Sequence, residues 1–213
     1  MLHIPRQILI LFVVIALLIF GRIIFSGSQY YLFLFWNIFL AFVPFVISRI
    51  VSLISKKDDS KYIGVLIAGA FLWLITFPNA PYLVTDVIHL GHNRLMPVWY
   101  DAILLFLTAW VGMLFTFYSL SNIEKSLRTK FSQIKTEVIL GLAILLSSFG
   151  IYLGRFLRWN SWDVITNPTE LTFDILDIFM HPSRHGEAFG FTIVMLIFIS
   201  VSYYAWKSGH ENK

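Results

Sequence analysis

Residues 30–54 read YYLFLFWNIFLAFVPFVISRIVSLI, and Arg49 is the one charged residue among them. About 20 mainly apolar residues are enough for a helix to cross the hydrocarbon core of a bilayer. The stretch is therefore predicted to be a membrane-spanning helix. Apolar runs of the same kind lie on both sides of it, at 8–25, 62–77, 98–120, 138–157 and 188–206.

The composition agrees with six such spans. Apolar residues make up 58% of the 213 residues and charged residues 13%, against about 25% charged in a typical soluble domain. A soluble core of this size could not hide so much apolar surface, whereas a bilayer covers it. We expect a single membrane domain with an all-α, polytopic transmembrane helical bundle. The absence of cysteine from the sequence excludes disulfides, thiolate metal sites and cysteine nucleophiles.

Basic residues fall mainly on one side of a six-span chain, in loops 55–61 and 122–137 and toward both chain ends. The first run is longer than a signal-peptide core, and no clear A-x-A site follows it, so we expect a retained anchor with both termini cytoplasmic. The short basic loops indicate topology and no nucleic-acid partner, although such residues can also contact anionic headgroups. The predicted cytoplasmic set is Arg6, Arg49, Lys56, Lys57, Lys61, Lys125, Arg128, Lys130, Lys135, Lys207 and Lys213, and the opposite set is Arg22, Arg94, Arg155, Arg158 and Arg184.

The segment FPNAPYLVTDVIHL, residues 77–90, predicts a break in the third helix. Pro78 disfavours helix at Phe77, Asn79 can cap a new helix, and Pro81 fits its first turn. The restarted helix would be polar on one face and apolar on the other, so it either lies at the interface with its polar stripe in water or turns that stripe inward to line a cavity. The polar stripe consists of Tyr82, Thr85, Asp86 and His89.

The fourth run opens with Pro97 and has Asp101 in its first turn, where the helix dipole favours a carboxylate. A dipole-stabilised, partly exposed aspartate is one interpretation, and a functional acid is the other. A stripe of small and polar residues continues below it, which favours close helix packing over a solute path. The stripe is Thr108, Gly112, Thr116 and Ser119.

The densest group of functional residue types is YLGRFLRWNSWD, residues 152–163. If the helix continued through it, Arg155 and Arg158 would share a face with Trp159 and Trp162. Guanidinium groups suit bidentate binding of phosphate or carboxylate, and indoles provide cation–π contacts. The alternative is that both arginines reach the surface and pair with acidic residues such as Asp163 or Asp86.

Histidines could bind a metal only in a few combinations, of which His89, His92 and Asp86 is the most plausible. Solvated single histidines are the default expectation, and we predict no metal site and no cofactor. Asp174 and Asp177 are expected on a solvated turn of an interfacial helix at 172–180. Asn37 is expected to form an interhelical hydrogen bond.

The strings FPNAPYLVTD (77–86), WYD (99–101) and YLGRFLRWNSWD (152–163) resemble those of the family of bacterial multi-pass membrane proteins known as domain of unknown function 1361. The resemblance covers about the second to the sixth span. It implies a protein of the bacterial cytoplasmic membrane, and it brings no activity, substrate or cofactor.

The leading functional hypothesis is a polar pocket at the extracytoplasmic face that binds an anionic group, such as a lipid phosphate or carboxylate, or a lipid-linked substrate. Arg155 and Arg158 would hold the anion, and Asp86, His89 or Asp101 would supply catalytic proton-transfer groups. The alternatives are a non-catalytic assembly partner of another envelope protein and a small solute or ion transporter. Residues expected to support the pocket are Asn79, Tyr82, Trp159, Asn160, Trp162 and Asp163.

Overall fold

The computed structural model describes residues 5–56, 63–91 and 95–211, and all regular structure in those ranges is helical. Six helical segments are long and apolar enough to cross a membrane, which confirms the polytopic α-helical class. Lys57, Lys61, Tyr62, His92, Arg94 and Lys213 lie outside the described residues. The elements are α1 (Arg6–Ser26), η1 (Tyr30–Leu32), α2 (Phe33–Ile54), α3 (Ile63–Thr76), α4 (Asn79–Tyr82), η3 (Leu83–His89), α5 (Val98–Arg128), α6 (Gln133–Phe156), α7 (Asp163–Thr166), α8 (Pro168–Met180) and α9 (Gly186–Glu211).

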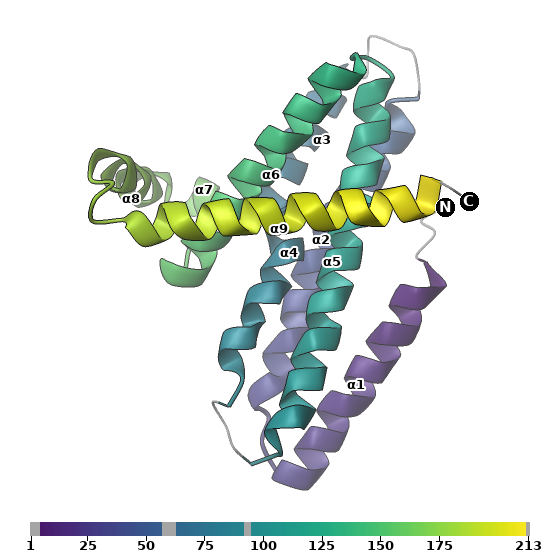
Figure 1. Cartoon of the computed structure of the whole chain (residues 1–213), viewed down its shortest axis with the longest axis vertical. Coiled ribbons are helices and arrows are strands. Elements are labelled where there is room, and N and C mark those ends of the chain that lie inside the picture. Colours follow the sequence, from purple (N-terminus) through teal and green to yellow (C-terminus); the bar gives the residue numbers. More distant parts are fainter. Residues whose placement is uncertain (1–4, 57–62, 92–94, 212–213) are drawn as a thin grey trace.

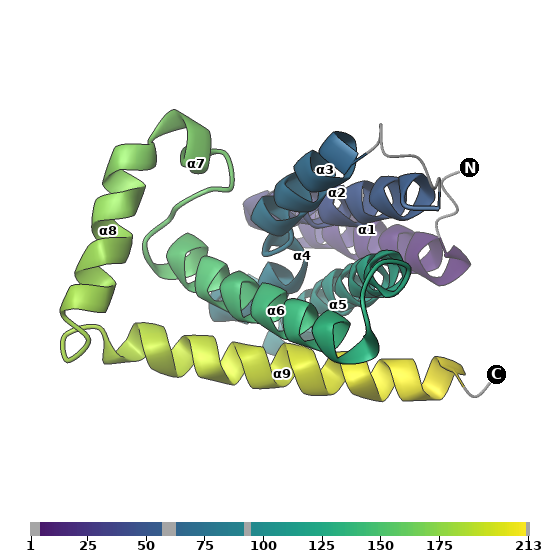
Figure 2. The ribbon, with the colours of Figure 1, turned by 90° about the horizontal axis from the view of Figure 1, so that it is seen from above.

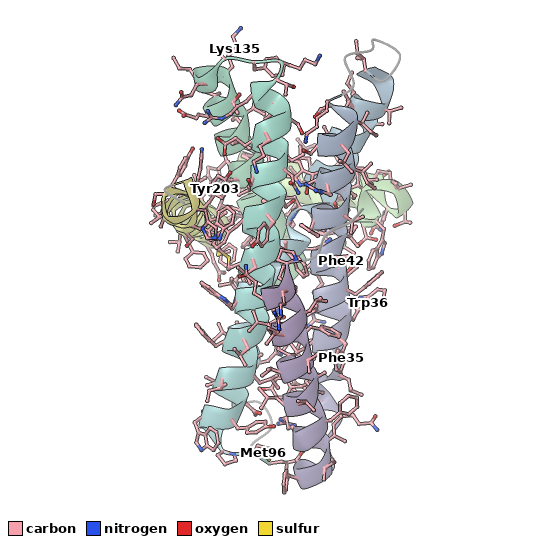
Figure 3. The ribbon with its side chains drawn as sticks, turned by 90° about the vertical axis from the view of Figure 1, so that its right-hand side faces the viewer. Phe35, Trp36, Phe42, Met96, Lys135 and Tyr203 are labelled. Atoms are coloured by element: carbon pink, nitrogen blue, oxygen red, sulfur yellow. The ribbon has the colours of Figure 1, made fainter. Side chains whose placement is uncertain are left out.

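The long helices α1, α2 and α5 run side by side, with α3, α4 and η3 in sequence along them and α6 leaning against them (Figure 1). Met96 lies at one end of this bundle and Lys135 at the other (Figure 3). We call the first the aspartate end, because Asp86 and Asp101 lie toward it, and the second the lysine end. Large apolar side chains stay exposed on the outside, as a lipid-facing surface requires.

The break in the third helix is confirmed. Residues 77 and 78 form a turn between α3 and α4, because Pro78 has no N–H to continue the helical hydrogen bonds. The expected cap is wrong in detail: Asn79 lies inside α4, and no side-chain cap hydrogen bond forms there. The chain then tightens into the 3-10 helix η3, which reaches the aspartate end.

At the lysine end, helices α5 and α6 extend beyond the apolar runs that predicted them. Helix α5 continues to Arg128 and α6 begins at Gln133, whereas the apolar runs stop at Leu120 and start at Val138. An apolar run marks the part of a helix that suits hydrocarbon, and the helix can continue beyond it as long as no proline or glycine interrupts it.

The small-residue stripe of α5 serves packing, as expected. Thr108, Gly112, Thr116 and Ser119 are all buried. A Cβ atom on Gly112 would lie 2.5 Å from the Ala80 carbonyl oxygen and 2.9 Å from the Leu83 Cβ. Only glycine therefore allows α4 and η3 to approach α5 this closely.

The last quarter of the chain, after α6, leaves the bundle and returns. The short helices α7 and α8 form an arm beside it, and α9 lies across the other long helices while packing along α6 (Figures 1 and 2). Because the arm, and not a tight turn, joins α6 to α9, the two helices need not run antiparallel along the bundle axis.

Candidate functional site

Arg155, in the last turn of α6, contacts the whole polar stripe of α4 and η3. Its Nε donates to Thr85 Oγ1 at 2.8 Å, and its Nη2 donates to Asp86 Oδ1 at 2.5 Å. Its Nη1 lies 3.4 Å from His89 Nε2, and its guanidinium carbon lies 4.0 Å from the centre of the Tyr82 ring. The stripe therefore faces inward, and one guanidinium group links all four side chains.

Asp86 is fully buried, and its two oxygens are both used. Oδ1 accepts from Arg155, and Oδ2 accepts from Asn37 Nδ2 of α2 at 2.9 Å. The hydrogen bond of Asn37 confirms the interhelical role expected for it. A buried carboxylate needs partners of this kind because its charged form is costly away from water.

His89 connects this pair to the start of the second span. Its Nδ1 lies 3.0 Å from the Tyr30 hydroxyl, and its carbonyl oxygen accepts from the Tyr31 hydroxyl at 3.0 Å. The ring is also packed against Phe33, with centroids 4.8 Å apart. His89 is thus half-buried and is held in place by aromatic residues.

Asp101 forms a second buried ion pair, with Arg22 of α1. Arg22 Nε lies 2.8 Å from Oδ1 and Nη2 lies 3.2 Å from Oδ2, and the two side chains are 1% and 2% exposed. The Tyr31 ring lies 4.5 Å from the Arg22 guanidinium carbon. The interpretation of Asp101 as a partly exposed, dipole-stabilised residue is therefore wrong, because α1 supplies a buried cation for it.

The condition for a shared arginine face is not met. Helix α6 ends at Phe156, and Arg158 is exposed, with a φ of 64° that carries the chain away from the helix axis. Among the described residues Arg158 forms no ion pair, whereas Arg155 pairs with Asp86, one of the two acidic partners considered from the sequence.

The segment after Arg158 is held by local and cross-helix hydrogen bonds. The carboxylate of Asp163 accepts a hydrogen bond from the Asn160 backbone N–H at 2.7 Å. This bond, with smaller contributions from Thr166 and the Asn160 side chain, lowers the pKa of the Asp163 carboxyl. Trp159 Nε1 donates to Asp174 of α8 at 2.8 Å. Asn79 Nδ2 donates to Ser161 Oγ at 3.1 Å, so this segment is tied back to α4.

A partly open cavity of about 300 Å³ lies between α2, the α3–α4 break, α6 and this segment. We call it the tryptophan cavity. No charged side chain lines it in the part of the chain that the structure describes; in particular, Arg155, Asp86, His89 and Asp101 are not among its lining residues. Its polar and aromatic lining residues are Trp36, Asn37, Asn79, Tyr82, Trp159, Asn160, Ser161 and Trp162.

Within the described residues no group of three or more histidine or acidic side chains is placed to hold a metal ion. His92, part of the most plausible combination, lies outside them. His181 Nδ1 and His185 Nε2 lie 2.8 and 2.9 Å from the two carboxylate oxygens of Asp177. The contact with His185, followed by that with His181, lowers the pKa of the exposed Asp177 carboxyl.

Sequence reasoning missed Arg22 and the two tyrosines of η1. The signal for Arg22 was present: a guanidinium group one turn inside an apolar run needs a partner, and Asp101 is the first acid of a run that starts at the same membrane face. Tyr30 and Tyr31 gave no such signal, because tyrosines at a span boundary are ordinary interface residues.

A family model described as protein of unknown function (DUF1361) matches residues 36–201. The match includes both segments that build the site, 77–89 and 152–163. No curated protein and no solved structure matches the chain.

Proposed function

Because this multi-pass membrane chain belongs to the DUF1361 family, whose description assigns no activity, we propose its function from the site: it binds a membrane lipid with an uncharged, hydroxyl-rich headgroup in the tryptophan cavity. The observation that carries the proposal is the composition of the cavity lining, which combines aromatic rings and amide side chains without a charge.

The lining suits a sugar-like headgroup. Each asparagine side chain offers a donor and an acceptor together, which matches neighbouring hydroxyl groups. Indole and phenol rings offer flat apolar faces for the C–H faces of a ring, and a small number of polar groups in a largely apolar pocket is the usual design of a small-molecule site. Asn37, Asn79 and Asn160 supply the amides; each amide nitrogen already donates one hydrogen within the protein, and its second hydrogen and the carbonyl oxygen remain for a ligand. Trp36 and Trp162 supply exposed indoles.

The lining also changes in polarity along the helices. Asn37 is followed one turn later by Leu40, and Asn79 is preceded one turn earlier by Ile75, both toward the lysine end. Leu146 of α6 extends the same apolar side. A ligand with its polar part toward the aspartate end and an apolar chain toward the middle of the bundle fits this gradient.

The buried ion pair supports binding and not chemistry. Arg155 holds the Tyr82 ring by a cation–π contact, and Asp86 holds the Asn37 amide, so the pair positions two side chains of the lining. Asp86 and Asp101 are themselves 0% and 2% exposed. We therefore assign positioning roles to Arg155 and Asp86 and do not extend the anion-binding hypothesis to this cavity.

The proposal includes an orientation. We assign the lysine end to the cytoplasmic side of a bacterial membrane, since Lys56, Lys130 and Lys135 follow the positive-inside rule there. The tryptophan cavity then opens toward the extracytoplasmic leaflet. A cysteine-accessibility experiment supports this orientation if a cysteine introduced at Arg158 reacts with an impermeant maleimide in intact cells and one at Lys130 does not.

The test uses the purified full chain in nanodiscs of phosphatidylcholine with a minor fraction of diglucosyl diacylglycerol. Native mass spectrometry measures which lipid the protein retains. Trp36→Ala and Trp162→Ala should each lower glycolipid retention about tenfold, because a stacked aromatic ring contributes about 1.4 kcal/mol through contact and area. Trp99→Ala is the matched control: Trp99 is also exposed, lies toward the aspartate end, and does not line the cavity.

The expected pattern is glycolipid enrichment over phosphatidylcholine in the unmodified chain and in the Trp99 variant, and its loss in the two cavity variants. Equal retention of both lipids by the unmodified chain contradicts the proposal. So does enrichment that all three variants share, since the indoles would then make no contact with the headgroup.

A second candidate function, an assembly partner of another membrane protein, is favoured by the α7–α8 arm. Ile165, Phe173 and Met180 are 82%, 66% and 65% exposed on it. Pull-down of the unmodified chain from solubilised membranes should then recover a second protein in stoichiometric amount. The Phe173→Ser variant should no longer recover that protein. Recovery of the chain alone, with α8 protected only by lipid, removes this candidate.

A further inference from the structure

A second cavity, of about 550 Å³, lies at the lysine end between α2, α5 and the end of α9. We call it the basic cavity. Its ionisable lining residues comprise four permanent cations, one carboxylate and one histidine, so the lining carries a clear excess of positive charge. They are Arg49, Glu124, Lys125, Arg128, Lys207 and His210.

Glu124 offsets only part of this charge. It is buried and accepts from Arg128 Nε at 2.8 Å, from Lys207 Nζ at 2.5 Å and from the Tyr203 hydroxyl at 2.6 Å. Its carboxylate is therefore fully engaged. The Nε of Arg49 is buried and donates to no group of the described residues. Arg49 also forms no ion pair with any described residue, so its charge is not compensated there and remains to attract an anionic group in the cavity that it lines.

An apolar groove of about 330 Å³ lies next to the basic cavity, between α1, α2 and α5. We call it the phenylalanine groove. All of its lining side chains are apolar, and they include Leu9, Phe12, Phe35, Phe42 and Phe115. Figure 3 looks onto this side of the bundle, with Phe42 above Phe35 along α2.

The two spaces follow one another along the same three helices. Pro5, Phe45 and Tyr118 line the basic cavity. The residues one turn farther from the lysine end on α1, α2 and α5 are Ile8, Phe42 and Phe115, and these line the phenylalanine groove. On all three helices the lining therefore changes from the basic cavity to the phenylalanine groove at the same level, within one helical turn of about 5 Å.

We propose that an anionic phospholipid of the leaflet at the lysine end binds here, with its phosphate in the basic cavity and one acyl chain in the phenylalanine groove. Arg49 and Lys125 contact the phosphate. The Tyr118 hydroxyl, which accepts from Gln7 Nε2 at 2.7 Å, keeps its own proton to donate to an ester carbonyl at the level between the two spaces.

The occupant is a lipid because neither space alone explains the pair. A soluble phosphate compound would leave the phenylalanine groove uncovered, and a neutral lipid would leave the basic cavity uncompensated. Anionic lipids are also the lipids that basic residues beside cytoplasmic helix ends attract. The site is separate from the tryptophan cavity in place, charge and lining.

The experiment measures retained lipid by native mass spectrometry from nanodiscs of equal parts phosphatidylglycerol and phosphatidylcholine. Arg49→Gln with Lys125→Gln should lower the ratio of retained phosphatidylglycerol to phosphatidylcholine at least fivefold. Lys56→Gln with Lys135→Gln removes the same charge from exposed residues that do not line the cavity, and should leave the ratio unchanged.

The groove has its own variant and control. Leu9→Trp fills the phenylalanine groove and should lower phosphatidylglycerol retention as strongly, whereas Leu17→Trp adds the same bulk to an exposed position of α1 outside it. In detergent, sn-glycerol 3-phosphate added in excess should displace the retained phospholipid only weakly.

Three outcomes overturn the proposal. An unchanged lipid ratio in the Arg49 and Lys125 variant excludes the headgroup site, and normal retention in Leu9→Trp excludes the acyl-chain groove. Full displacement of the lipid by sn-glycerol 3-phosphate would assign the cavity to a soluble phosphate compound. None of these results affects glycolipid retention in the tryptophan cavity, so the two proposals fail separately.

Discussion

The ion pair between Arg22 and Asp101 gives the sharpest prediction, because the sequence suggested a catalytic role for Asp101 and the structure gives it a structural partner. We consider three variants: Arg22→Met, Asp101→Leu and both together. Each single change leaves one buried charge without its partner. The double change replaces the pair by apolar side chains of similar size in an apolar surrounding.

The distances set the expected size of the effect. The closest nitrogen and oxygen atoms are 2.8 Å apart and both side chains are almost fully buried. At an effective dielectric constant of about 20, unit charges at this separation attract by about 6 kcal/mol before desolvation is subtracted. Removing one partner from a buried pair costs about 3–5 kcal/mol, whereas replacing both is often neutral. We expect each single variant to lose that amount and the double variant to lose less than either.

The assay is thermal unfolding of the purified chain in detergent, followed by tryptophan fluorescence at one fixed heating rate. For a chain of this length, each kcal/mol shifts the midpoint by about 2–4 °C, so the single variants should unfold about 6–20 °C below the unmodified chain. A fixed heating rate is needed because membrane proteins often unfold irreversibly, and the midpoint then depends on the rate.

The double variant decides the interpretation. If its midpoint falls by the sum of the two single shifts, the charges are not coupled and the buried pair is not what holds α1 to α5. The same variant tests whether Asp101 has a structural or a functional role. If both stability and lipid retention recover in the double variant, the role is structural. If stability recovers and lipid retention does not, Asp101 remains a candidate functional residue.

Two further predictions concern packing and pH. Gly112→Ala should destabilise the chain by about 1–3 kcal/mol in the same assay, because its Cβ would overlap a backbone oxygen, whereas Gly141→Ala, with open space around it, should be neutral or slightly stabilising. The carboxyl of Asp163 has a lowered pKa. Its stabilisation of the 160–166 turn should therefore be complete above its ordinary pKa of about 3.9 and disappear as pH falls through the lower folded-state value. The hydrogen-exchange protection factor of the Asn160 amide should follow this course, and Asp163→Ala should lower that factor already at neutral pH.

The fold could be predicted because each long helix is marked by the sequence of its own residues. The run at 30–54 needs no knowledge of its neighbours to be identified as a span, and Pro78 interrupts a helix whatever packs against it. The polar stripe ending at His89 also followed from spacing alone. All four of its side chains contact Arg155 in the folded chain, because residues that share a helix face can all reach one long side chain.

The partners of the charged residues could not be predicted in the same way. Asp101 and Arg22 are separated by 79 positions, and no periodicity in one helix states which other helix lies against it. The sequence placed Arg155 and Arg158 together because it assumed a continuous helix. The helix ends between them at Phe156, and this end separates a buried, ion-paired guanidinium group from an exposed one.

The positive charges at the two ends of the bundle differ in how they are paired, and this difference connects the two proposed lipid sites. Arg22 and Arg155, toward the aspartate end, are each matched by a buried carboxylate, so the cavity beside them is neutral. At the lysine end, the described residues that line the cavity include four cations and one carboxylate, Glu124, so the cavity there is basic. Because both cavities become apolar toward the middle of the bundle, each proposed site fits a lipid of one leaflet, and we infer that the charge of its lining selects the headgroup. A bilayer whose anionic lipids lie mainly in the cytoplasmic leaflet would fill both sites with the lipid that each one fits.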